Sequence, residues 1–165
     1  MGEFITRILI WMALILYAGS VVCFVENQIR IARWLRTIGC LLYLAHVAAA
    51  FGYYHDWSHH EAARSTAAET EAVTGIKTGL GIYVNYLFTL VWSADVLYWW
   101  LAGNSRYVSR RLAISISLHA FFVFMILNGA IIFANGPARI IGAVLLSVVL
   151  VNFVIAGWKR RNASV

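Results

Sequence analysis

The sequence predicts an all-α integral membrane protein with five transmembrane helices, on the evidence of its composition, its apolar segments and the placement of its basic residues. Of its 165 residues, 62% are hydrophobic and only 12% are charged, and the mean hydropathy is +0.76. A soluble domain carries about 25% charged residues, and a chain of this size could not cover so much apolar surface in water. The composition also excludes a disordered or disulfide-stapled chain. We therefore expect a single transmembrane domain, 1–165, with the lipid bilayer as its first partner.

Five apolar segments are long enough to cross a bilayer, for which about 20 residues are needed. Only helices are expected at this length, because lipid offers no partner to unpaired backbone groups. The expected spans are 4–25, 34–54, 80–102, 112–134 and 139–158.

Basic residues gather in alternate connections, and this asymmetry indicates the orientation of the chain. Nine stand on one side, namely Arg30, Arg33, Arg36, Arg106, Arg110, Arg111, Lys159, Arg160 and Arg161. Four stand on the other side, namely Arg7, Arg64, Lys77 and Arg139. The positive-inside rule then predicts an outer N-terminus and an inner C-terminus. We expect the inner (cytoplasmic) membrane of a bacterium, and no binding of nucleic acid, because the basic residues form no single patch.

The connection 55–79 is expected to form a short outer surface helix. Ser58 and Glu61 stand at capping-box spacing, with Ser58 as the N-cap residue. An alanine-rich run follows, and Gly75 can terminate the helix. We expect this helix to lie over the outer ends of the spans.

The start of this outer segment holds the densest group of metal-ligand residue types in the chain. Imidazole and carboxylate ligands together suit copper, zinc or iron. Against a metal site stands the simpler interpretation that these are ordinary polar residues at the membrane surface. The candidate ligands are His55, Asp56, His59, His60 and Glu61.

Three ionisable residues are expected at depth in the membrane, namely His46, Asp95 and His119. Such groups are costly in lipid and are functional candidates by default. Counting residues along the spans places Asp95 and His119 at one level, with His46 roughly 9 Å nearer the outer side. Each of the three lies on a stripe of aromatic or small residues at helical spacing, which favours the interior of a bundle.

These three residues support two functional hypotheses. In the first, His46 and His119 are the axial ligands of a b-type haem, and Asp95 orients one imidazole. The difference in depth between His46 and His119 disfavours this pair of ligands. A haem with a single histidine ligand is equally compatible with the sequence. In the second hypothesis, Asp95 and His119 form a hydrogen-bonded pair in a proton- or quinone-linked site.

A purely structural role is the remaining interpretation of the buried polar groups. Polar residues hold neighbouring helices together, and Asp95 could pair with Arg110 or Arg111 reaching in from the inner face. No serine-hydrolase or nucleotide-binding motif is present, so we expect no catalytic activity of the chain on its own. The leading expectation is a small subunit of a membrane redox or metal-handling system, which binds haem or a transition metal through histidines. Partner membrane subunits or further copies of the chain are expected to cover its apolar surface.

Overall fold

A computed structural model describes residues 2–134 and 136–162, of which 88% are helical and none forms a strand. The predicted all-α class is therefore confirmed for these residues. The π-helix η1 continues α5 without a break. The elements are α1 (Gly2–Val25), α2 (Ile29–Tyr54), α3 (His59–Thr74), α4 (Gly81–Val108), α5 (Leu112–Leu127), η1 (Asn128–Ile132) and α6 (Pro137–Asn162).

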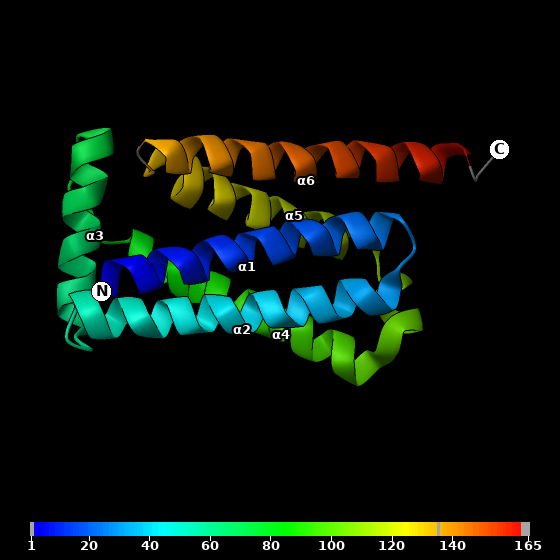
Figure 1. Ribbon diagram of the computed structural model, residues 1–165, viewed down its shortest axis with the longest axis horizontal. Helices are drawn as coiled ribbons and strands as arrows, with labels where there is room; N and C mark the ends of the chain where they lie inside the picture. The colour runs from blue at the N-terminus through cyan, green and yellow to red at the C-terminus, as the bar shows by residue number, and fades with distance from the viewer. Residues whose placement is uncertain (1, 135, 163–165) are drawn as a thin grey trace.

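The long helices lie along one common axis, and α3 lies across one end of them (Figure 1). Consecutive long helices run in opposite directions, so that the N-terminus and the C-terminus lie at opposite ends of the bundle. Helix α1 packs against α2 and α6, α2 packs against α4, and α5 packs against α4 and α6. The short helix α3 contacts α4 at the end where α1 begins and α2 ends.

Four of these helical segments are long and apolar enough to cross a membrane, which supports an all-α membrane protein. They are Gly2–Val25, Ile29–Tyr54, Leu112–Ile132 and Pro137–Lys159. Helix α4 has 28 residues but is less apolar, because it carries Asn85, Asp95 and several Tyr and Trp side chains. Large apolar side chains face outward from the bundle, as contact with lipid requires: Leu41, Leu90 and Val154 are 60%, 66% and 73% exposed.

The predicted outer helix is present, with both of its predicted ends. The Ser58 hydroxyl accepts the backbone N–H of Glu61 at 3.3 Å, and Gly75 closes the helix at a φ of +76°. Only this half of the capping box is formed, because the Glu61 carboxylate is paired with Arg64 instead. Left-handed backbone at Asp56 and Trp57 reverses the chain before α3, so α2 does not continue through the histidine cluster.

An aromatic core fills the middle of the bundle and joins four of the helices. Tyr17 of α1 stacks on Phe122 of α5 at 4.6 Å between ring centroids, and Tyr43 of α2 stacks on Trp92 of α4 at 5.2 Å. Trp92 is fully buried and also contacts Phe88 and Phe122 edge-on or tilted. Each such ring pair stabilises the packing by about 0.5–1.5 kcal/mol beyond the area that it buries.

Helix α6 approaches η1 most closely at Gly142. A side chain at this position would overlap the carbonyl and Cβ of Ala130, whereas Gly157 in the same helix has no atom within 4 Å of an added Cβ. Small residues allow this kind of backbone approach between helices in a membrane. The pair of glycines therefore provides a matched test of the packing of α6.

We expect Gly142→Ala to lower the free energy of unfolding by about 1–3 kcal/mol, because the new methyl group must push α6 away from η1. Gly157→Ala should leave stability unchanged or raise it slightly, since alanine is the better helix former. Unfolding in detergent micelles, followed by circular dichroism, measures both. Equal stabilities for the two variants would contradict the observed packing.

Candidate functional site

Asp95 lies at the centre of a buried ion-pair network, which we call the Asp95 centre and which also contains Arg36, Tyr107 and Arg110. Its Oδ2 is 3.3 Å from Nη1 of Arg36, and its Oδ1 is 2.7 Å from Nη1 of Arg110. The Tyr107 hydroxyl donates to the same carboxylate, 3.0 Å from each oxygen. The Asp95 side chain is fully buried, and those of Arg36 and Arg110 are 2% and 6% exposed.

Arg36 reaches Asp95 from the second turn of α2. Its Nε donates to the Ser20 hydroxyl at 3.3 Å, and Ser20 in turn donates to the carbonyl of Ala32. The guanidinium lies over the ring of Tyr17, 4.7 Å from its centroid, which stabilises the cation further. The sequence analysis had counted Arg36 among the charges of an inner connection. That assignment was wrong, although Arg36 already stood two residues inside the expected span 34–54.

A break in α4 brings Tyr107 and Arg110 back to the same carboxylate. Gly103 has a φ of +79° and a ψ of 170°, a combination that glycine adopts far more easily than other residues. Beyond this break the chain bends away from the axis of α4 (Figure 1). Tyr107 then stacks on Trp99 at 3.7 Å with almost parallel rings, and Arg110 lies over Tyr107. The Tyr107 hydroxyl is the donor in its two contacts with Asp95, because a carboxylate can only accept.

The Asp95 centre is closed, because both carboxylate oxygens already have partners within the chain. This agrees with the structural interpretation, in which Asp95 pairs with Arg110. No interaction among the described residues joins Asp95 to His119. The half-buried His119 instead pairs its Nδ1 with the Tyr17 hydroxyl at 3.1 Å and lies beside the ring of Phe153. The expected Asp95–His119 pair is therefore not formed.

His46 and His119 do not face a common site. His46 contacts the carbonyl of Thr6, whereas His119 contacts Tyr17, eleven residues further along α1. Eleven residues correspond to a rise of about 16 Å along a helix. Two axial ligands of one iron must lie on opposite sides of the same atom, so the structure does not support a haem held between this pair.

His46 instead lines a cavity of about 530 Å³ beneath α3, which we call the α3 cavity. Its walls come from α1, α2, α3, α4, α5 and η1, and its volume is in the range of small-molecule binding sites. The walls combine apolar side chains such as Leu14, Phe88 and Ile126 with a few polar ones. The polar side chains at the cavity include His46, His55, Glu69, Asn85, Tyr86 and Thr89.

The hydrogen bond of His46 fixes which of its ring nitrogens is available to a ligand. The carbonyl of Thr6 can only accept, so Nδ1, at 2.9 Å from it, carries the proton. In the neutral ring Nε2 then keeps its lone pair. Because the same ring lines the cavity, Nε2 is the nitrogen that can bind a metal or accept a proton there. Metal-ligating histidines are oriented in this way, by a bond from the other nitrogen to a carbonyl.

The π-helix η1 forms part of the wall of the α3 cavity. Its residues Gly129 and Ala130 line the cavity, next to Met125 and Ile126 of α5. A single π-turn inside an α-helix is rare and often occurs at a functional site. Nothing in the sequence analysis predicted this turn, since five residues of ordinary apolar composition carry no signal for it.

The residues of the outer histidine cluster do not converge on one point. His59 pairs its Nδ1 with the Tyr86 hydroxyl at 2.8 Å, which ties α3 to α4. His60 is exposed beside Glu61, and Asp56 is exposed in the turn. Only His55 of this group lines the α3 cavity. In the part of the chain that the structure describes, no three His, Cys, Asp or Glu residues are arranged to hold a metal ion.

Comparison with known proteins adds no assignment: no protein-family model, no curated protein and no solved structure matches this chain. Among the described residues, the Asp95 centre is a closed site and the α3 cavity with His46 is an open one.

Asp95→Asn removes the negative charge of the Asp95 centre while keeping the shape of the side chain. Arg36 and Arg110 would then be buried together without a counter-charge, which should cost about 3–5 kcal/mol of stability. Denaturant titration of the purified protein in micelles measures the loss. Asp56→Asn, in the exposed turn before α3, is the matched control and should change stability by less than about 0.5 kcal/mol. A comparable loss of stability in both variants would contradict the role of Asp95 as the counter-charge of the two arginines.

Proposed function

We propose that the chain is a small membrane subunit of a redox system, with five spans, an outer N-terminus and an inner C-terminus, and that its α3 cavity binds a b-type haem or another transition-metal group through His46. The observation that carries the proposal is the oriented imidazole, whose Nδ1 is fixed on the carbonyl of Thr6. Its other nitrogen is left for a ligand in the α3 cavity.

The fifth span in this proposal is α4. It has the length to cross a bilayer, it lies along the same axis as the four more apolar helices, and it is packed against α2 and α5 (Figure 1). Its least apolar group, Asp95, is neutralised inside the bundle, which removes the main cost of placing this helix in lipid. The orientation follows from the excess of basic residues at the end opposite α3.

A haem requires an apolar space with a ligand at one face, and the mostly apolar lining of the α3 cavity, together with the imidazole of His46, supports this proposal. Rings of Phe51, Tyr86 and Phe88 are among the walls, and small residues such as Ala50 and Gly129 leave room beside them. The described part of the cavity offers no second histidine at the level of His46, so the bound iron would have one protein ligand and an open position. Such an open position would allow the iron to bind a small molecule.

A quinone or quinol is the second candidate ligand, and the α4 wall of the cavity favours it. Asn85 and Thr89 stand one helical turn apart on this wall, and the Thr89 hydroxyl is 3.2 Å from that of Tyr43. A quinol hydroxyl could donate to Nε2 of His46 while its other oxygen binds these polar groups. This second proposal places the quinone in the α3 cavity, whereas the hypothesis from the sequence placed it at Asp95 and His119.

Cysteine accessibility tests the five spans and their orientation. In a chain without its native thiols (Cys23→Ala, Cys40→Ala), Ala68→Cys on α3 and Ser105→Cys beyond the break in α4 lie on opposite sides of the fifth span. We expect a membrane-impermeant maleimide to label Ala68→Cys in intact cells and to label Ser105→Cys only after permeabilisation. Labelling of both positions from the same side would contradict a membrane-spanning α4.

An optical spectrum of protein purified from its native membrane tests the ligand. We expect a Soret band, and an α band on reduction, with about one haem per chain. His46→Gly should lose the haem, and added imidazole should restore it by replacing the missing ligand. His60→Gly, at an exposed position outside the cavity, is the matched control and should keep the spectrum of the unaltered chain.

The other outcomes of this experiment are equally informative. Absence of haem and metal, together with a quinone in an organic extract that His46→Gly no longer retains, would replace haem by the second candidate. Absence of every one of these groups would overturn the proposal and leave a purely structural subunit.

A further inference from the structure

A second cluster of side chains lies at the end of the bundle opposite α3 and has no part in the proposed function. We call it the Arg33–Trp100 cluster; it also contains Trp34 and Thr37. The guanidinium of Arg33 lies 4.0 Å from the centroid of the Trp100 ring. Trp34 packs edge-on against Trp100 at 4.9 Å, and the indole N–H of Trp100 donates to Thr37 at 2.9 Å. These contacts hold the cation in a defined position between α2 and α4.

Arg33 has no anionic partner within the described chain. Its Nε is buried without a hydrogen-bond acceptor there, and none of the ion pairs between described residues includes it. Arg36, three residues later, is paired with Asp95. A buried donor without an acceptor is costly, and a guanidinium near the membrane surface is stabilised by an anion that reaches its terminal nitrogens. No described residue supplies that anion.

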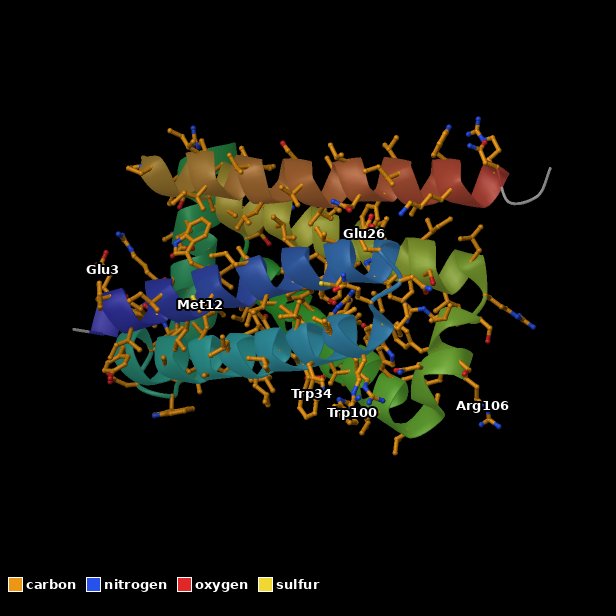
Figure 2. All side chains as sticks on the ribbon, turned by 45° about the vertical axis from the view of Figure 1, so that its right-hand side comes forward. Glu3, Met12, Glu26, Trp34, Trp100 and Arg106 are labelled. Carbon is orange, nitrogen blue, oxygen red and sulfur yellow. The ribbon has the colours of Figure 1, made fainter. Side chains whose placement is uncertain are left out.

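The position of the Arg33–Trp100 cluster indicates which kind of anion it binds. Trp34 and Trp100 lie side by side on the outside of the bundle (Figure 2) and are 50% and 37% exposed. Tryptophans near the ends of spans are typical of the level of the lipid headgroups. Stacking on Trp100 occupies the face of the guanidinium and leaves donors at its edge, which match the oxygens of a phosphate.

The surroundings of the cluster carry an excess of positive charge. Arg30 lies one helical turn before Arg33 on α2, and Arg106 lies beyond the break in α4 at the same end of the bundle (Figure 2). Both side chains are exposed, and Glu26, the nearest acidic residue in the sequence, is paired with Lys159. An anionic lipid is therefore favoured over a zwitterionic one.

We propose that the Arg33–Trp100 cluster is a binding site for the phosphate of an anionic phospholipid headgroup. The phosphate accepts hydrogen bonds from the edge of the Arg33 guanidinium, while Trp34 and Trp100 contact the glycerol backbone and the start of the acyl chains. The proposal concerns the opposite end of the bundle from the α3 cavity and does not depend on what that cavity binds.

Lipid retention measured by native mass spectrometry tests the site. The protein is released from nanodiscs that contain equal amounts of phosphatidylglycerol and phosphatidylcholine. We expect the unaltered chain to retain phosphatidylglycerol, and Arg33→Gln to lower its occupancy about tenfold, as expected for loss of a charge-assisted pair of hydrogen bonds. Arg33→Lys should lower the occupancy by a smaller factor, since it keeps the charge but loses the planar fork.

Arg106→Gln is the matched control, because it removes one exposed charge from the same end of the bundle. It should leave the occupancy nearly unchanged. An equal loss from Arg33→Gln and Arg106→Gln would mean that lipid responds only to diffuse surface charge, and would overturn the site. Retention of both lipids alike by the unaltered chain would do the same. Displacement of the retained lipid by inorganic phosphate would assign the cluster to a free anion instead.

Discussion

Asp95 places a carboxylate in the apolar interior of the bundle, and much of the packing around it follows from the need to neutralise that charge. A charged group in a medium of low polarity is tolerated only when it is paired and hydrogen-bonded. Arg36 supplies one partner from α2, and Tyr107 and Arg110 supply the others from beyond the break in α4. The break at Gly103 is the backbone feature that allows the same helix to present Asp95 and then return over it.

The two ends of the molecule differ in how completely their polar groups are paired. The basic end holds several closed contacts beside the Arg33–Trp100 cluster: the Asp95 centre, the stacked rings of Trp99 and Tyr107, and the pair of Lys159 with Glu26. At the other end α3 covers the helices without filling the space beneath it, and the α3 cavity remains. In this account the paired charges of the Asp95 centre fix α2 and α4, and these two helices carry His46 and the polar residues Asn85 and Thr89 of the cavity wall.

Most of the fold could be predicted from the sequence, because lipid imposes strong rules on a chain of this composition. The helix ends agree with the expected spans to within a few residues, apart from the N-terminal end of α2, the C-terminal end of α6 and the extension of α4 to Val108. Both ends of α3 were predicted from Ser58 and Gly75, since capping depends on single residues. On α4 a stripe was predicted to face inward: Asn85, Phe88, Trp92, Asp95 and Trp99. The last four of these side chains are buried, whereas Asn85 is exposed. The break at Gly103 and the π-turn η1 were not predicted, because each depends on tertiary packing.

The candidate site was predictable only in part. The individual importance of His46 and Asp95 followed from the cost of ionisable groups in lipid, but their partners did not. Residue counting gave depth along one axis and no rotation about it, so it could not show that Thr6 and Tyr17 direct the two histidines to different places. Arg36 was missed because a charge two residues inside a predicted span was treated as part of the connection. The α3 cavity is built from six elements, and no local pattern predicts such a volume.

An experimental density map of the protein, purified from its native membrane without exchange of bound small molecules, tests the central claim most directly. The account predicts non-protein density inside the α3 cavity, in contact with Nε2 of His46, while Nδ1 remains bonded to Thr6. A cavity closed by collapse of α3 onto the bundle, or a His46 ring turned so that Nε2 bonds to the protein itself, would contradict it.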